Sequence, residues 1–403
     1  MPHTYSVSVY VYIGAGSRYE TEAQAGASHF IEHLCFRGTE KRLTSNDISR
    51  AVERVGGMLN GSTGKEVTVY SCKVAKPHFP LALDVLSDML LHSRFDKDDI
   101  EKERHIIIEE ISMSKDEPGQ LAGMHLDELL WPDHPLGRDV AGTNESVGTV
   151  TRELMLDYMD SEYCPANTVI AIAGNINHDE AVSEVNKVFG PWENRKTRLN
   201  YLPYHELKNP RLKIENRETE QAHLYLALPG LSIHHPQRFI LDLMNIILGE
   251  VASSRLFHEI RDKLGLAYDI HSYLDHFQDC GALTVYAGVH PKNLEVSISA
   301  ILEQLILLKK TVSPEELSDA KELSKGRILL RMEDSRSVAG WVGGQEILNG
   351  SILDVEEVVA IIDKVTAEEM CALAKELLIG DRLRLSVVGP VKSADHLEKL
   401  LEI

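Results

Sequence analysis

Long apolar runs are missing from this sequence. No stretch approaches the roughly 18 residues that a membrane-spanning helix needs, and residues 1–7 lack the basic start and apolar block of a secretory signal. Cysteine is scarce as well, since the 5 cysteines are odd in number and widely scattered. Such spacing argues against a disulfide framework and favours free thiols in a reducing compartment. We therefore expect a cytoplasmic protein without a membrane partner.

Basic side chains are also in short supply. Lys and Arg number 42 against 62 Asp and Glu, so the formal net charge is -20. This balance argues against nucleic acid as a partner, because phosphate binding needs a cationic face. It suits basic or neutral ligands drawn into an acidic cavity. The 403 residues, 43% of them hydrophobic, are enough for two or three domains with cores of their own.

The chain reads as two similar halves. Residues 151–174 and 366–389 each predict a helix, then a strand, then a closing glycine, with the same spacing from the first threonine to that glycine. A charge-rich stretch punctuated by proline separates the halves and reads as a linker. We therefore expect one half over 1–195, a linker over 196–212 and a second half over 213–403. The alternative is that any two α+β segments can be laid over each other in this way.

A cluster of chemically active side chains lies at His29-Phe30-Ile31-Glu32-His33. On a helix, positions i and i+4 face the same way, so both imidazoles can reach one metal ion, and Glu32 lies on that face too. Two neutral imidazoles suit Zn²⁺, and a catalytic site adds a third protein ligand and keeps a position for water. A carboxylate beside that water can accept its proton. The alternative is an ordinary histidine pair on an amphipathic helix.

A second helix, expected over 97–115, carries two carboxylates beside its apolar stripe. Glu103 and Glu110 lie together next to isoleucines, whereas Glu109 points directly away from the stripe. A carboxylate beside buried isoleucines needs a cation or a full set of hydrogen bonds. One interpretation makes Glu110 the third metal ligand and Glu103 a carboxylate that supports a ligand or faces the substrate. The other is a solvated helix edge with arginine partners.

The context His-Phe-Ile-Glu-His-Leu-Cys-Phe-Arg-Gly-Thr resembles the inverted zinc motif of the M16 metallopeptidases, the family of pitrilysin, insulysin and mitochondrial processing peptidase. Further similar segments lie at 56–63, 133–138, 142–143, 253–257 and 261–268. The resemblance covers nearly the whole chain. It implies an α+β fold of two homologous α/β-sandwich-type halves, each a mainly antiparallel sheet covered by helices, which together form half of a clamshell.

The resemblance also implies roles for the polar cluster. His29, His33 and Glu110 would hold one Zn²⁺ per chain, and Glu32 would be the general base of peptide hydrolysis. Glu103 corresponds to the family's additional glutamate. The half over 1–195 would then be catalytic, and the half over 213–403 would carry no metal.

Substrate binding is implied along the strand that follows the first pair of glycines. The family pairs an extended peptide with an exposed strand edge there, and the matching residues are Asn60, Gly61, Ser62 and Thr63. The alternative for Asn60 is a turn residue before Gly61. From the second half, Arg261 would hold a carbonyl or acidic group, and Tyr268 would donate to the oxyanion.

Two departures from the family pattern stand out. The family has a strand before the one expected at 5–13, and this sequence starts without it, either because that strand lies further upstream or because this is a natural short form. Gly61-Ser62 also replaces a bulkier pair beside the substrate. We expect a zinc-dependent endopeptidase that acts on peptides or unfolded polypeptides as a homodimer, or as a heterodimer with an inactive homologue. The rivals are a non-catalytic, cavity-shaping subunit and a structural zinc site.

Overall fold

We describe a computed structural model of the chain, which covers residues 1–193, 201–206, 210–391 and 394–401. Much of the linker expected over 196–212 therefore lies outside the described residues. The described residues form two compact units. The first unit takes residues 1–112, 138–202 and 329–352; the second takes 113–137, 203–328 and 353–403. Each unit thus contains a segment from the other half of the sequence, while the ranges 1–195 and 213–403 stay a prediction about the two halves.

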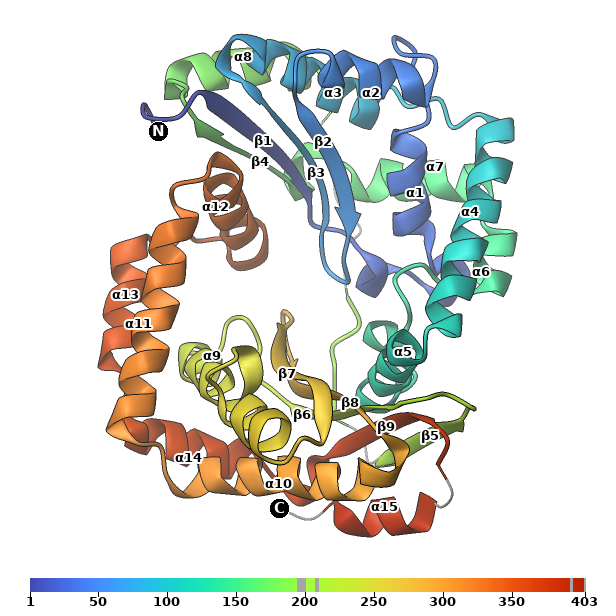
Figure 1. Ribbon diagram of the computed structural model, residues 1–403. Helices are drawn as coiled ribbons and strands as arrows, with labels where there is room; N and C mark the ends of the chain where they lie inside the picture. Colours follow the sequence, from blue (N-terminus) through green and yellow to red (C-terminus); the bar gives the residue numbers. More distant parts are fainter. Residues whose placement is uncertain (194–200, 207–209, 392–393, 402–403) are drawn as a thin grey trace. The chain divides into compact units, whose positions relative to one another are not determined.

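The first unit is built on a four-stranded antiparallel sheet with the order β2-β3-β1-β4 (Figure 1). Its strands are β1 (Ser6–Ile13), β2 (Met58–Thr63), β3 (Thr68–Ala75) and β4 (Thr168–Gly174). β1 alternates serine or tyrosine with valine or isoleucine, a pattern that favours a strand with two different faces. The order leaves β2 and β4 at the edges of the sheet, so within the described part of the chain one row of β2 backbone groups has no partner strand.

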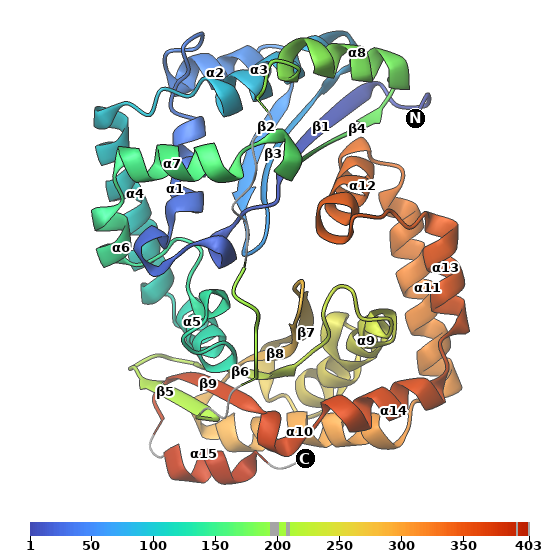
Figure 2. The same ribbon diagram turned by 180° about the vertical axis from the view of Figure 1, so that it is seen from behind.

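Helices cover both faces of the first sheet (Figure 2). The unit contains α1 (Ala27–Cys35), α2 (Ser45–Glu53), α3 (Phe79–Leu91), α4 (Lys97–Asp116, to residue 112), α6 (Asn144–Thr149), α7 (Arg152–Glu162), α8 (His178–Phe189) and α12 (Ser335–Asn349). α2, α3 and α8 lie on one face and α12 lies on the other. β1 is therefore buried on both sides, which explains why most of its residues are buried.

Residues 335–349 reach the first sheet through polar contacts. The Ser335 hydroxyl lies 3.0 Å from that of Ser6 and 2.9 Å from that of Ser8, and the Tyr12 hydroxyl donates to the Gly340 carbonyl at 3.1 Å. Glycine permits the close approach, because a Cβ on Gly343 would lie 2.3 Å from the Tyr12 ring. Serine, tyrosine and glycine on these facing surfaces thus account for the packing of α12 on β1.

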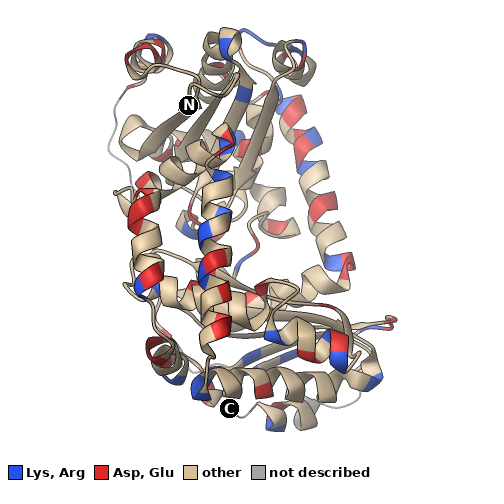
Figure 3. Cartoon of the chain, turned by 60° about the vertical axis from the view of Figure 1, so that its left-hand side comes forward, with Lys and Arg blue, Asp and Glu red and all other residues tan. Residues whose placement is uncertain are grey.

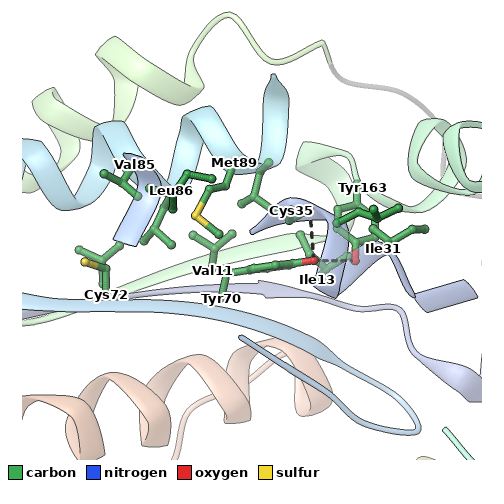
Figure 4. Close-up of a cluster of buried hydrophobic side chains, with 14 of the residues drawn as sticks. Val11, Ile13, Ile31, Cys35, Tyr70, Cys72, Val85, Leu86, Met89 and Tyr163 are labelled. Atoms are coloured by element: carbon green, nitrogen blue, oxygen red, sulfur yellow. Dashed lines mark hydrogen bonds between the residues drawn. The ribbon is translucent and has the colours of Figure 1, made fainter. Parts of the chain in front are cut away.

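The main core of the first unit lies on the opposite face of the sheet (Figure 4). It joins strand residues to helix residues, among them Val11, Ile13, Ile31, Cys35, Tyr70, Cys72, Val85, Leu86, Met89 and Tyr163. The Tyr70 hydroxyl donates to Cys35 Sγ at 3.6 Å and lies 3.3 Å from the Tyr163 hydroxyl, so the one polar group of this large side chain is satisfied. Full burial of each large apolar side chain contributes about 1.5–3 kcal/mol.

The second unit repeats this architecture. Its strands are β5 (Leu212–Asn216), β6 (Ala222–Pro229), β7 (Ala267–His276), β8 (Gly281–Val289) and β9 (Arg384–Gly389), in the order β5-β9-β6-β8-β7. β5 pairs with β9 in parallel and the other pairs are antiparallel. If β6 to β9 are matched in chain order with β1 to β4, the sheet order β7-β8-β6-β9 is the same as β2-β3-β1-β4. β5 is an additional strand next to β9. The expected α+β fold with two homologous, mainly antiparallel halves is confirmed.

The helices of the second unit complete its layers. They are α5 (Pro118–Leu130), α9 (Arg238–Asn245), α10 (Leu294–Lys310), α11 (Pro314–Arg331, to residue 328), α13 (Val355–Lys364), α14 (Ala367–Leu377) and α15 (Ala394–Leu400). α5 packs on β6 and β9 although it comes from the first half of the sequence. Charged residues lie mostly on the helices, with acidic and basic positions interspersed (Figure 3). All five cysteines have free thiols.

Candidate metal centre

The helix α1 is fixed at its start by a buried carboxylate. Glu20 accepts the backbone amides of Gly26 at 2.8 Å and Ser28 at 2.7 Å, two of the groups that a helix N-terminus leaves without internal partners. A negative charge at this end also interacts favourably with the helix dipole. Further along, Phe30, Ile31 and other apolar side chains of α1 enter the core. These contacts determine which way the remaining face of α1 points.

That remaining face carries the two histidines. His29 and His33 are one turn apart, and their Nε2 atoms approach to 3.2 Å. Each side chain is 19% exposed, so both imidazoles are reachable from solvent on one side. Burial, reinforced by the nearby His33, lowers the pKa of His29 to about 4. His29 is therefore neutral at pH 7, which is the form that binds metal.

Glu110 brings a carboxylate from α4 to the same point. Its Oε2 atom lies 3.9 Å from His29 Nε2 and 3.7 Å from His33 Nε2. Tetrahedral zinc with ligands at about 2.0–2.1 Å holds its donor atoms roughly 3.3 Å apart, so these spacings fit one ion. Among the described residues, these side chains form the only group of three or more His, Cys, Asp or Glu that could hold a metal ion, with ligand atoms within 4.8 Å of one another.

Glu103 lies behind His33 rather than beside Glu110. It is 2% exposed, and its Oε2 atom is 2.8 Å from His33 Nδ1, while Oε1 contacts the guanidinium of Arg37. A carboxylate on Nδ1 fixes the tautomer that leaves the Nε2 lone pair for a metal. Glu103 therefore lies where it can orient the His33 ring, and its role in the site stays a prediction. Glu109 is exposed and takes no part in the group.

Glu32 lies on the same helix and faces β2. The Thr63 hydroxyl donates to its Oε2 atom at 2.6 Å. Burial raises the pKa of Glu32 above its ordinary value, and the hydrogen bond from Thr63 acts in the opposite direction. A carboxylate with a raised pKa is suited to proton transfer near neutral pH.

The expected substrate residues divide between two faces of β2. Leu59, Gly61 and Thr63 are partly buried, whereas Asn60 and Ser62 are exposed. Successive side chains of a strand point to opposite faces, so four consecutive side chains cannot all face one ligand. Thr63 contacts Glu32, while the backbone of β2 stays available along its outer edge.

Arg261 and Tyr268 belong to the second unit. The Arg261 guanidinium lies 4.8 Å from the centre of the Tyr268 ring and 4.6 Å from that of Phe257. Tyr268 is 77% exposed at the start of β7, so its hydroxyl is not occupied by the core of this unit. The role expected for this pair in substrate binding stays a prediction.

Three contacts of the site were not expected from the sequence. They are the Glu20 carboxylate at the start of α1, the Thr63 hydroxyl on Glu32, and Arg37 on Glu103. Arg37 follows His33 by four positions, so helical spacing could have placed it near the same partner. The sequence carries no comparable signal for Glu20 or Thr63.

Two histidines one turn apart, a glutamate between them and a second glutamate from another helix are typical of an inverted-motif zinc peptidase. Family comparison agrees with that class. The family described as insulinase (peptidase family M16) matches residues 1–144, and the one described as peptidase M16 inactive domain matches residues 149–324. The chain belongs to the M16 peptidase family.

Relatives match along the full chain. The sequence is 38% identical over 416 residues to an uncharacterized zinc protease of Mycobacterium leprae, covering 100% of this chain and 91% of the relative. It is 36% identical over 392 residues to the uncharacterized zinc protease YmxG of Bacillus subtilis, covering 96% and 94%. A solved structure of a protease from Helicobacter pylori has the same fold, with a TM-score of 0.87 at 22% identity over 96% of this chain and 94% of that one.

Zinc is the metal of this family, and the donor atoms of His29, His33 and Glu110 fit it. The M16 family acts on peptides, so the chain is a peptidase-type hydrolase. No helix in the described part of the chain is long and apolar enough to cross a membrane.

Proposed function

We propose that this chain is a zinc-dependent endopeptidase that hydrolyses peptides or unfolded segments. His29, His33 and Glu110 are the zinc ligands, and Glu32 is the general base. The observation that carries the proposal is the approach of His29 Nε2, His33 Nε2 and Glu110 Oε2 to within 3.9 Å of one another. The presence of Glu32 on the same helix favours a catalytic site, because a purely structural zinc site needs no base.

Each residue has a separate task. His29 and His33 offer their Nε2 atoms, and Glu103 keeps the His33 ring oriented through Nδ1. When bound, zinc supplies Lewis acidity that lowers the pKa of water and polarises the peptide carbonyl. Glu32 accepts the proton of the attacking water and returns it to the leaving amine.

The substrate pairs as an extended strand with the free edge of β2. Main-chain hydrogen bonds then supply affinity with little sequence preference. Asn60 and Ser62 contact the substrate from the exposed face of this strand, and the backbone at Gly61 and Thr63 completes the pairing. Arg261 and Tyr268 of the second unit bind the scissile region, with the Tyr268 hydroxyl donating to the oxyanion.

Two chains enclose the substrate. Each chain supplies half of a clamshell chamber that admits peptides and excludes folded proteins, either as a homodimer or with an inactive homologue. The second candidate function is a non-catalytic subunit that shapes the cavity of a partner. The description of residues 149–324 as an inactive domain favours it weakly, and the intact His-x-x-Glu-His set disfavours it. The working location is the cytoplasm.

Three carboxamide variants test the proposal. Glu32→Gln keeps shape but removes the proton acceptor, so we expect bound zinc to be retained and hydrolysis of a diverse peptide mixture to fall by about 10²–10⁴-fold. Glu110→Gln removes a ligand and should lower the zinc content. Glu109→Gln, the exposed neighbour, is the matched control and should change neither. Peptide hydrolysis at the original rate by zinc-loaded Glu32→Gln would exclude Glu32 as the base.

A further inference from the structure

β2 carries two residues that together determine where the Glu32 carboxylate sits. Gly61 and Thr63 are two positions apart, so they share the face of the strand that meets α1. We propose that Thr63 is a positioning residue that holds Glu32 in the orientation for proton transfer, and that Gly61 leaves the space its carboxylate occupies. This inference rests on the proposed role of Glu32 as the base.

The Thr63 contact restrains one carboxylate oxygen. Its hydroxyl lies 2.6 Å from Glu32 Oε2, a short distance typical of a hydroxyl donating to a charged acceptor. A glutamate side chain has three rotatable bonds, and a single strong donor at one oxygen limits the rotation of its end group. The other oxygen, Oε1, stays available to accept a proton.

Gly61 leaves room for that second oxygen. A Cβ built on Gly61 would lie 2.8 Å from Glu32 Oε1 and 2.8 Å from Phe36 Cε2, closer than real Cβ contacts allow. A larger residue would therefore require the carboxylate or the Phe36 ring to move, and the carboxylate is the end of the more flexible side chain. The sequence led us to expect that Gly61 reduces the bulk beside the substrate. In the structure, the space that Gly61 leaves is occupied by the Glu32 carboxylate.

The strand that carries Thr63 is held in position by its neighbour β3. Thr63 pairs with Thr68 in the antiparallel register of β2 and β3, and the Thr68 hydroxyl donates to the Ala15 carbonyl at 2.9 Å. Positioning groups on sheet elements are more accurate than those on loops. Because β2 is also an edge strand, a peptide added to that edge would be aligned by the strand that orients the base.

The test measures kcat and KM of peptide hydrolysis and, separately, the zinc content of each variant. Thr63→Val keeps the shape and removes the donor, so we expect kcat to fall by roughly 10-fold or more, with KM and zinc content unchanged. Thr63→Ser restores a hydroxyl and should recover most of kcat. Thr168→Val is the matched control, because it removes a hydroxyl that donates to the Cys164 carbonyl at 2.8 Å in β4, the other edge strand of the same sheet. It should lower the melting temperature and leave kcat within about twofold.

A second pair of variants keeps the proposal testable if Thr63→Val does not fold. Gly61→Ala should lower kcat with zinc retained, whereas Gly148→Ala, where an added Cβ meets nothing within 4 Å, should behave as the original chain. An unchanged kcat in Thr63→Val or Gly61→Ala, or a change in KM or zinc content alone, would overturn the positioning role. The base assignment is judged separately by Glu32→Gln, so the two failures are distinguishable.

Discussion

His33 makes contacts on both sides of its ring, and the two sides face different partners. Nε2 faces His29 and Glu110, while Nδ1 faces the buried Glu103. Glu103 in turn contacts Arg37, so its buried carboxylate lies between the imidazole of His33 and a partly exposed guanidinium. Partners of this kind typically change metal affinity or activity by about 10–100-fold.

Glu103→Gln is therefore expected to weaken zinc binding. The amide can still accept from His33, but it no longer carries the negative charge that faces the imidazole and Arg37. We expect zinc affinity to fall by about 10–100-fold, measured by competition with a chelator of known affinity. The control is Glu101→Gln on the same helix, where the side chain is 64% exposed and pairs with Arg104. Equal zinc affinity in both variants would contradict a supporting role for Glu103.

Among individual residues, the sequence predicted those that lie near one another because of helical spacing. The 3.6-residue period places His29, Glu32 and His33 on one face, and the apolar stripe of α4 marks Glu110 as a candidate, while the family resemblance supplied their roles. Thr63 was expected to face the substrate, and its hydrogen bond to Glu32 joins residues 31 positions apart. Such a contact depends on how a strand packs against a helix, and no local pattern encodes it.

Among the elements, α11 shows how a helix start is held by charge. Glu316 in its first turn accepts from Arg255 Nε at 2.6 Å and Nη2 at 2.9 Å, and from the Ser313 amide at 2.9 Å. The hydrogen bonds from Arg255 are the largest cause that lowers the pKa of Glu316 from 4.5 to about 2. A bidentate Arg–carboxylate pair of this kind is among the stronger surface interactions.

The lowered pKa gives Glu316 a defined effect on acid stability. A carboxylate with a lower pKa in the folded state stabilises the fold above its unfolded pKa, here about 4.5, and loses that contribution as the pH falls toward about 2. Glu316→Gln should therefore lower the free energy of unfolding on the order of 1 kcal/mol at pH 7, and by less at pH 3. Denaturant titrations at both pH values measure this difference. Glu315→Gln, its exposed neighbour, should show no such pH dependence.

Element types were predictable where the residue pattern is strong. The strand expected at 5–13 and the helix expected at 97–115 agree with β1 and α4 to within one residue at each end. β2 is different, because Met58–Thr63 contains glycine and polar residues and lacks β-branched alternation. It is a strand because β3 pairs with it, which is a tertiary cause.

For the whole molecule, the expected contribution of the second unit to chemistry is the hydroxyl of Tyr268. This side chain is 77% exposed, and its ring centre lies 4.8 Å from the Arg261 guanidinium. We expect Tyr268→Phe to lower kcat by about 10²–10³-fold with zinc content unchanged, since a hydrogen bond made in the transition state would be lost. Steady-state kinetics with metal analysis measure this.

The matched control is Tyr5→Phe, which removes a hydroxyl from a side chain that is 91% exposed in the first unit. Full activity of Tyr268→Phe would show that the second unit provides no oxyanion donor. The proposed roles of the base and the zinc ligands would not depend on that result.

The division into units could not be predicted from the two repeated halves. The repeat places a boundary near the linker, whereas α5 and α12 each pack with the unit of the other half. α12 has a weakly amphipathic sequence with three glycines, Gly340, Gly343 and Gly344, which by itself does not indicate a partner. Its place is determined by the match with the serine and tyrosine face of β1.

The packing of α12, which comes late in the chain, on the early strand β1 has a consequence for synthesis on the ribosome. Ser6 is made 329 positions before Ser335, which contacts it. At about 5–20 residues per second, one face of the nascent first sheet waits roughly 16–66 s for its covering helix. An uncovered valine face would invite association between nascent chains. On β1 the valines face the early core instead, and the waiting face presents Ser6, Ser8, Tyr10 and Tyr12, which water can hydrate until the helix emerges.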